Sequence, residues 1–104
     1  MDTEVRDANE RRRYEIFADG KLAGFAEYQD IDDTRVFTHT EIDEAYEGRG
    51  LGGILVRAAL DDADTTARSI VALCPFVRHT VDEHPEYQPL VDQKLDARLR
   101  RRST

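Results

Sequence analysis

Up to about residue 43, apolar and polar residues alternate in short runs, which is the pattern of β-strands that bury one face. The first run covers residues 14–17 and is followed by Asp19-Gly20, a pair typical of hairpin turns. A second run covers residues 23–28, an acidic turn follows at residues 30–33, and a third run covers residues 35–43. The sequence therefore predicts an antiparallel meander.

Strict alternation in the third run predicts which of its side chains share a face of the sheet. The expected faces are Val36, Thr38, Thr40 and Ile42 on one side, and Phe37, His39 and Glu41 on the other. The histidine and the glutamate would then project together.

The hydrophobic period changes after residue 50. Leu51, Ile54, Leu55 and Ala58 are spaced i, i+3, i+4, i+7, which predicts an amphipathic helix that runs to about residue 67. The nearly unbroken apolar run at residues 69–74 fits a strand buried on both faces. A right-handed β-α-β connection would place that strand parallel to the third strand.

A short helix at residues 76–83, stopped by His84-Pro85, and a weakly anchored helix within residues 90–102 complete the prediction. The expected fold class is α+β, with the elements in the order β-β-β-α-β-α. Residues 1–10 are polar and are expected to be frayed, residues 11–91 to form one domain, and residues 92–104 to form a basic tail able to adopt a helix.

Composition and charge argue against several classes of function. The chain has 104 residues and a formal net charge of −7, which argues against a nucleic-acid binder because phosphate neutralisation needs a basic face. The basic runs at residues 11–13 and 98–102 are interpreted as solvated chain ends, with contact to an anionic ligand as the alternative. No apolar run is long enough to cross a bilayer and the N-terminus lacks a signal region, so we expect a cytoplasmic protein without a membrane partner.

Cysteine and histidine usage excludes two further features. Cys74 is the single cysteine, so no internal disulfide can form. The three histidines lack metal-ligand spacing, and no metal site is expected.

The stretch EAYEGRGLGGILVRAAL, residues 44–60, holds Gly48, Gly50, Gly52 and Gly53 where the third strand gives way to the helix. Glycines let a backbone approach a phosphate closely, and the first N–H groups of a helix attract anions. No Lys-Ser/Thr follows, which excludes a P-loop, and a meander before the loop disfavours a Rossmann unit. From the glycines alone, a phosphate cradle and a plain tight turn stay equally open.

Residues 40–52, TEIDEAYEGRGLG, resemble the acetyl-CoA-binding motif of the GNAT superfamily of N-acetyltransferases. The resemblance is closer to the short-form group of about a hundred residues, and it spans roughly residues 14–91. The matching segments are His39-Thr40, Cys74-Pro75-Phe76 and His84-Pro85-Glu86-Tyr87.

The resemblance implies a minimal GNAT-like fold, in which a splayed parallel strand pair leaves a slot for the pantetheine arm of coenzyme A beside residues 70–74. It implies that residues 11–91 bind acetyl-CoA, with the Ile42 backbone amide bonded to the thioester carbonyl. The loop residues implied to hold the pyrophosphate are Glu47, Gly48, Arg49, Gly50, Leu51, Gly52 and Gly53. Glu47 departs from the family's Gln or Arg, so its side chain is expected to turn to solvent while Arg49 supplies positive charge.

The resemblance also suggests catalytic residues. His39 is the natural general base for a protonated amine, with a structural role as the alternative. Glu41 could orient the imidazole, act as the base, or be merely solvated. Cys74 is implied to lie near the acetyl group, where it could be acetylated, supportive or an inert core residue. Thr80 stands where relatives often carry an aromatic residue, and Tyr46 and Tyr87 are candidate proton donors to the departing thiolate.

The leading hypothesis is therefore an acetyl-CoA-dependent N-acetyltransferase in which an amine attacks the thioester directly. The acceptor would be a small molecule or a protein lysine, and the enzyme a monomer or dimer. A non-catalytic coenzyme A or acyl-CoA binding module is the alternative, and a scaffold that keeps only the fold ranks third.

Overall fold

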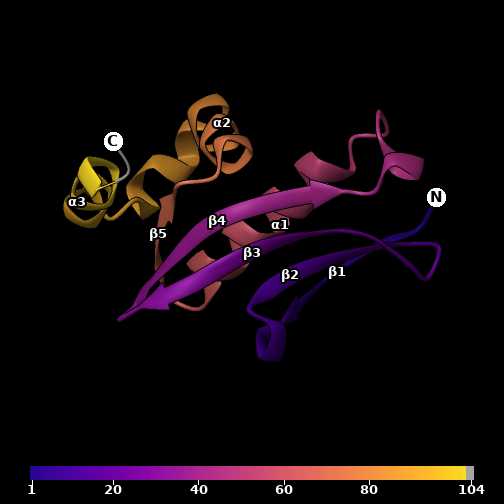
Figure 1. Cartoon of the computed structure of the whole chain (residues 1–104), viewed down its shortest axis with the longest axis horizontal. Helices are drawn as coiled ribbons and strands as arrows, with labels where there is room; N and C mark the ends of the chain where they lie inside the picture. The colour runs from indigo at the N-terminus through magenta and orange to yellow at the C-terminus, as the bar shows by residue number, and fades with distance from the viewer. Residues whose placement is uncertain (103–104) are drawn as a thin grey trace.

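The computed structural model describes residues 1–102 and shows one five-stranded sheet with a long helix across one face (Figure 1). The strands lie in the order β1-β2-β3-β4-β5; the first four are antiparallel and β5 is parallel to β4. The strands are β1 (Thr3–Ala8), β2 (Arg13–Ala18), β3 (Lys21–Ile31), β4 (Thr34–Ile42) and β5 (Ser69–Ala72). The α-helices are α1 (Leu51–Thr65), α2 (Pro75–Glu83) and α3 (Gln93–Arg102). Three 3₁₀ turns join them: η1 (Asn9–Arg11), η2 (Glu44–Tyr46) and η3 (Pro85–Leu90).

The α+β class, the meander and the β-α-β unit are confirmed, but the expected element order is one strand and one helix short. The frayed segment expected at residues 1–10 is wrong, because residues 3–8 form β1. This edge strand pairs along its whole length with β2, while Val5 and Ala8 are its only residues that are not exposed. Backbone hydrogen bonds and the Asp7 carboxylate, rather than an apolar face, hold it, so its sequence carries no strand periodicity.

The expected faces of the third predicted strand are also wrong for two residues, because β4 contains a β-bulge. His39 pairs with Glu27, yet Phe37 pairs with the next β3 residue, Tyr28, which leaves Thr38 as an extra residue. A bulge shifts the alternation by one position. Phe37 therefore shares the helix-covered face with Thr40 and Ile42, whereas Val36 shares the opposite face with His39 and Glu41.

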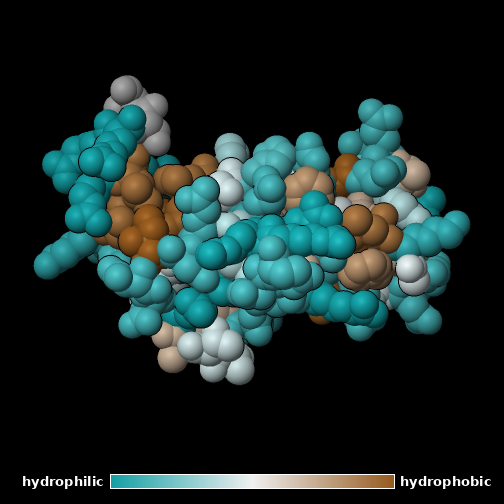
Figure 2. Space-filling model, turned by 60° about the horizontal axis from the view of Figure 1, so that its bottom comes forward, coloured by the Kyte–Doolittle hydropathy of each residue, from teal (hydrophilic) through white to brown (hydrophobic). Residues whose placement is uncertain are grey.

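The main core lies between the sheet and α1, which runs behind the strands in Figure 1. Its fully buried members include Ile16, Tyr28, Phe37, Leu55, Leu60 and Ile70. A second, smaller cluster lies on the other face, where α3 covers β5; it contains Val36, Val71 and Leu95, with Leu73 and Leu99 partly buried. Figure 2 shows an apolar patch where α3 and β5 lie, on a face otherwise covered mainly by hydrophilic residues.

A buried cation ties the meander together. The guanidinium of Arg35 donates two hydrogen bonds to the Asp30 carboxylate, at 2.9 and 3.0 Å, and a third to Asp7, at 3.2 Å. It also donates to the Tyr14 hydroxyl at 2.8 Å and lies 3.9 Å from the centre of the Tyr28 ring. Arg35 is only 2% exposed, so each of these partners offsets the cost of removing its charge from water.

Two tyrosines extend this network. The Tyr14 hydroxyl donates to Asp62 of α1 at 2.7 Å, and the Tyr28 hydroxyl donates to Asp7 of β1 at 2.6 Å. Burial raises the pKa of Tyr28 to about 12, so its hydroxyl remains a donor at physiological pH. The charge on β4 is thus linked to β1, β2, β3 and α1.

We predict that Asp30→Asn destabilises the protein by about 2–3 kcal/mol, because one partner of a largely buried charge pair is lost. The hydrogen bonds from Arg35 lower the pKa of Asp30 below its ordinary value of 3.8. Because the pKa of Asp30 is lower in the folded protein, its carboxylate stabilises the fold at pH values above its pKa in the unfolded chain. This stabilisation is lost as the pH falls through the pKa of Asp30 in the folded protein. Urea unfolding of Asp30→Asn should therefore show a smaller loss of stability than wild type when the pH is lowered below 3.8.

Asp64→Asn is the matched control, because Asp64 is exposed on α1. It should leave both the stability at pH 7 and the acid dependence close to those of the wild type. Equal effects of the two substitutions would mean that Asp30 is not a special partner of Arg35.

Candidate functional site

The parallel strands β4 and β5, which lie at one edge of the sheet, separate about halfway along β4. Their pairing ends at Phe37 and Ala72, after which the N–H groups of Leu73 and Cys74 both donate to the Phe37 carbonyl, at 3.0 and 3.1 Å. β4 continues through residues 38–42, still paired with β3 but with no strand partner on its other edge among residues 1–102. The separation was expected from the family resemblance, and it leaves an open strand edge.

The backbone N–H and C=O groups of Thr40 and Ile42 face this open edge. The Asp43 N–H donates to the Ala23 carbonyl of β3 at 2.8 Å. Peptide groups alternate in direction along a strand, so the N–H and C=O of Ile42 and Thr40 point the other way. These N–H and C=O groups have no strand partner in the described part of the chain, and such groups are satisfied by water or a ligand.

The glycine loop begins directly beyond this edge. Asp43 caps η2 by accepting the Ala45 N–H at 2.9 Å. Gly48 and Gly50 then adopt φ values of +79° and +76°, a left-handed conformation that glycine tolerates best. Gly50 is the N-cap of α1 and accepts the Ile54 N–H at 3.3 Å, so the preceding N–H groups of the first turn have no partner within the helix.

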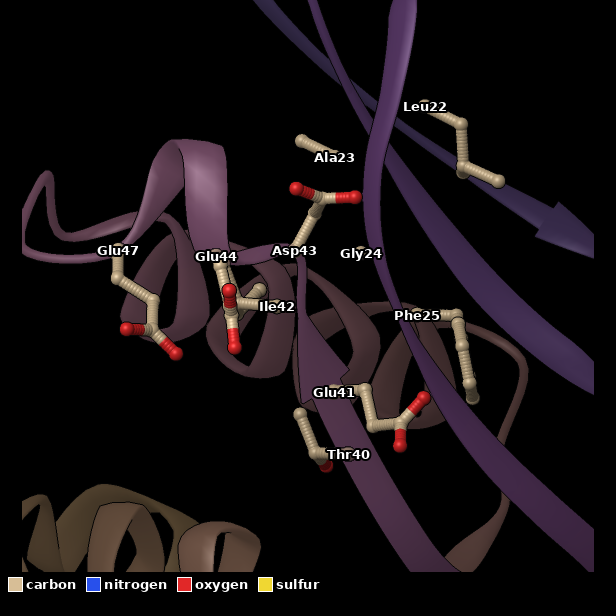
Figure 3. Close-up of a pocket in the computed structure, with 10 residues that line it drawn as sticks. All are labelled: Leu22, Ala23, Gly24, Phe25, Thr40, Glu41, Ile42, Asp43, Glu44 and Glu47. Atoms are coloured by element: carbon tan, nitrogen blue, oxygen red, sulfur yellow. The ribbon is translucent and has the colours of Figure 1, made fainter.

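Two cavities flank the open edge of β4. The first, which we call the glycine-loop cavity, has a volume of about 340 Å³. Its walls are Thr40, Ile42, Tyr46, Glu47, Gly48, Gly50, Leu51, Gly52, Gly53 and Phe76. The second, which we call the acidic cavity, has a volume of about 590 Å³. Its walls are Leu22, Ala23, Gly24, Phe25, Thr40, Glu41, Ile42, Asp43, Glu44 and Glu47 (Figure 3).

Gly52 and Gly53 differ sharply in their surroundings. A Cβ on Gly52 would lie 2.6 Å from Cζ of Phe76, whereas a Cβ on Gly53 would meet nothing within 4 Å. Phe76, at the start of α2, therefore lies directly against the first turn of α1, and it stays 43% exposed. This contact forms one wall of the glycine-loop cavity.

His39 and Glu41 form a pair on the sheet face opposite α1. The His39 Nε2 lies 3.3 Å from the Glu41 Oε1, and both side chains are more than half exposed. The Phe25 ring centre is 6.2 Å from that of His39. Glu41 lines the acidic cavity. His39 does not line it, but it contacts Glu41.

Cys74 lies on the other side of β4 and does not meet His39. Its Sγ donates to the Thr40 Oγ1 at 3.4 Å, and the residue is only 4% exposed. Since Thr40 and His39 are on opposite faces of β4, the structure does not bring the cysteine and the histidine together.

The remaining residues singled out in the sequence have ordinary surroundings. Glu47 is exposed, and the Arg49 guanidinium lies 5.9 Å from the Tyr46 ring centre. The hydroxyl of Tyr87 donates to Asp61 at 2.9 Å and the residue is buried, whereas Tyr46 lines the glycine-loop cavity. His79 pairs with Glu83 on the exposed face of α2.

Sequence reasoning missed Leu22, Phe25 and Asp43 as cavity residues. No local motif marks them, because they come from the start of β3 and from a capping position. The pairing of Phe25 with Glu41 was the available signal, once the strand register was known.

Within residues 1–102, no helix combines the length and apolar character needed to span a membrane. The same part of the chain contains no group of three or more His, Cys, Asp or Glu side chains arranged to hold a metal ion.

Comparisons with known proteins agree with this geometry. The model of the family described as GCN5-related N-acetyl-transferase matches residues 13–90. The NMR solution structure of a proposed GCN5-like N-acetyltransferase from Staphylococcus aureus is similar with a TM-score of 0.64 and 21% identity, over 85% of this chain and 86% of that chain.

The crystal structure of the ribosomal-protein-S18-alanine N-acetyltransferase from Escherichia coli is similar with a TM-score of 0.54 and 23% identity, over 59% of this chain and 41% of that chain. At these identities, the two structures establish a shared fold. The comparison with curated proteins gave no match.

We predict that Gly53→Ala stabilises the protein by up to about 0.5–1 kcal/mol, because alanine favours the helix and its Cβ meets open space. Gly52→Ala should gain less, because the new Cβ must displace the Phe76 ring. Thermal unfolding gives the stabilities, and the aromatic resonances of Phe76 should shift in Gly52→Ala alone. Equal gains with unchanged Phe76 resonances would contradict the packing of this ring on α1.

Proposed function

Because this chain belongs to the GCN5-related N-acetyltransferases, we propose that it transfers an acetyl group from acetyl-CoA to an amine, in the cytoplasm. The observation that carries the proposal is the unpaired edge of β4 next to the glycine loop. Hydrogen-bonding groups at this edge and at the start of α1 meet in one cavity, where a thioester and a diphosphate need them.

The pyrophosphate of acetyl-CoA would bind the N–H groups of residues 47–53. The left-handed Gly48 and Gly50 bring this backbone to the surface, and the positive end of the α1 dipole favours the anion. Arg49 is an exposed cation within the same loop. The pantetheine arm would run along the gap where β5 leaves β4, with the thioester carbonyl accepting the Ile42 N–H.

The chemistry requires a proton to leave the acceptor before attack. We assign this step to the Glu41–His39 pair: one of its two groups accepts a proton from the ammonium, and the other stabilises the protonated partner. The amine nitrogen then forms a bond to the carbonyl carbon, while the Ile42 N–H stabilises the developing oxyanion. The carbon–sulfur bond breaks, and the nitrogen loses its second proton to solvent, which leaves a neutral amide. The departing thiolate takes a proton, for which the Tyr46 hydroxyl is the candidate donor in this cavity, and the Tyr46 oxygen is reprotonated from solvent.

Cys74 takes a supporting role in this proposal. Its thiol is buried and bonded to Thr40, and it is not among the residues that line either cavity. An acetyl-cysteine intermediate would need the thiol to leave this contact and to reach a base, and the His39 ring lies across the strand. Direct attack of the amine is therefore the simpler mechanism.

We predict that His39→Ala and Glu41→Gln each lower kcat by about tenfold to a hundredfold, at the low end of general-base effects because each leaves its partner in place. Release of coenzyme A thiol with a panel of amines measures kcat, and calorimetry measures acetyl-CoA binding, which should change less than twofold. His79→Ala is the matched control, since His79 and Glu83 form a pair with the same 3.3 Å separation on the exposed face of α2.

Three outcomes would contradict part or all of this proposed function. Equal losses of turnover and coenzyme binding in His39→Ala would mean that the histidine is structural. Tight acetyl-CoA binding without thiol release with any amine would favour the non-catalytic coenzyme-binding module. Absence of acetyl-CoA binding at millimolar concentration would contradict both functions.

A further inference from the structure

The acidic cavity is not used by the coenzyme in the proposal above. Its walls have two chemically distinct parts. The start of β3 supplies apolar surface, with Leu22 42% exposed and Phe25 beside it. The end of β4 and the loop after it supply four carboxylates, and the lining contains no Lys or Arg; these acids are Glu41, Asp43, Glu44 and Glu47.

The position of this cavity is as informative as its charge. Phe25 and Glu41 pair on the sheet face opposite α1, whereas the glycine loop leads into α1 itself. The two cavities nevertheless share Thr40, Ile42 and Glu47, so they meet at the open edge of β4. A molecule in the acidic cavity would approach a thioester bound at Ile42 from the side that carries Glu41.

Glu47 gains an explanation from this arrangement. A carboxylate beside a diphosphate weakens coenzyme binding by repulsion, and the resemblance to the family gives no reason for it. Glu47 lines both cavities, and in Figure 3 its carboxylate points in the same direction as that of Glu44. The same negative charge attracts a cation in the acidic cavity.

We infer that the acidic cavity is the acceptor site, and that the acceptor is a linear alkyl diamine or polyamine. This inference rests on the proposed function. One amino group reacts at the edge of β4 beside Glu41, and a second, charged amino group is held by Glu44 and Glu47. Leu22 and Phe25 supply the apolar surface of the cavity for the methylene groups. The volume of about 590 Å³ is in the range of small-molecule sites, which favours a free amine over a protein side chain.

Three ligands of similar length isolate the second charge: 1,4-diaminobutane, butylamine, and 4-aminobutanoate, in which a carboxylate replaces one amine. In the thiol-release assay with saturating acetyl-CoA, the diamine should have a KM about tenfold or more below that of butylamine. The amino acid should be the poorest substrate. The advantage of the diamine should shrink as salt is raised, because the acidic groups are exposed to solvent.

Two variants then test the residues. Glu44→Gln should raise the KM for the diamine about two- to fivefold and leave that for butylamine unchanged, which is the size expected for one exposed charge pair. Glu47→Gln should raise the KM for the diamine while lowering the KM for acetyl-CoA, since it removes repulsion from the diphosphate. A distorted loop would raise both values. Glu10→Gln, at the opposite end of the sheet in η1, should change neither.

A binding experiment separates this inference from the proposed function. With coenzyme A bound, 1,4-diaminobutane should shift amide resonances in residues 22–25 and 41–47, and these shifts should disappear in the Glu44→Gln Glu47→Gln double variant. Such shifts without turnover would refute the enzyme and keep the diamine site. Turnover with equal KM values for the diamine and butylamine, or a better protein lysine substrate, would keep the enzyme and overturn the acceptor assignment.

Discussion

The charge of Arg35 is the constraint on which most of this small fold depends. A guanidinium that is 2% exposed must find partners on every side, and it finds them on β1, β2 and β3. Through the Tyr14 hydroxyl the same network reaches Asp62 of α1. The meander is therefore fixed in register and in depth relative to the helix by directional bonds, which apolar packing alone would not supply. This also explains how an edge strand as polar as β1 stays in place.

A rigid meander allows the other half of β4 to be irregular. Beyond Phe37, the bulge at Thr38 turns the strand, and β5 departs after Ala72. The bulge shifts the register between β3 and β4 by one residue, but their pairing resumes after it and continues as far as Ile42. The two halves of β4 therefore differ. The first half packs its side chains into the core, and the second half has unpaired peptide groups between the two cavities.

The fold class could be predicted from the sequence because its main signals are local. The turn pair Asp19-Gly20 and the helical spacing after Leu51 each depend on a few neighbouring residues. β1 could not be predicted, because its partners are backbone groups of β2 and a buried arginine remote in sequence. The face assignment was wrong for Val36 and Phe37, because the bulge at Thr38 that shifts the alternation leaves no mark in a Thr-His-Thr segment.

Some parts of the candidate site could likewise be predicted from the sequence, and others could not. The glycine loop was recognisable by composition, and it lies where the sequence placed it, at the start of α1. The pairing of His39 with Glu41 followed from alternation, and it holds because both residues come after the bulge. The apolar wall at Leu22 and Phe25 was not recognisable, because its relation to β4 depends on register. The position of Cys74 against Thr40 likewise needs the departure of β5 from β4.

The two terminal strands of the sheet, β1 and β5, are both protected against adding another strand. β1 presents charged side chains such as Glu4 and Arg6, and β5 is short, bridged by Val91 and covered by α3. Beyond the end of β5, the second half of β4 forms the border of the sheet, and this part of the border is unpaired within the described residues. Any extended chain that reached this gap could form the bonds that β5 does not. The edge that we propose binds the coenzyme is therefore also where mispairing with a foreign peptide can begin, and a ligand bound there would block such mispairing.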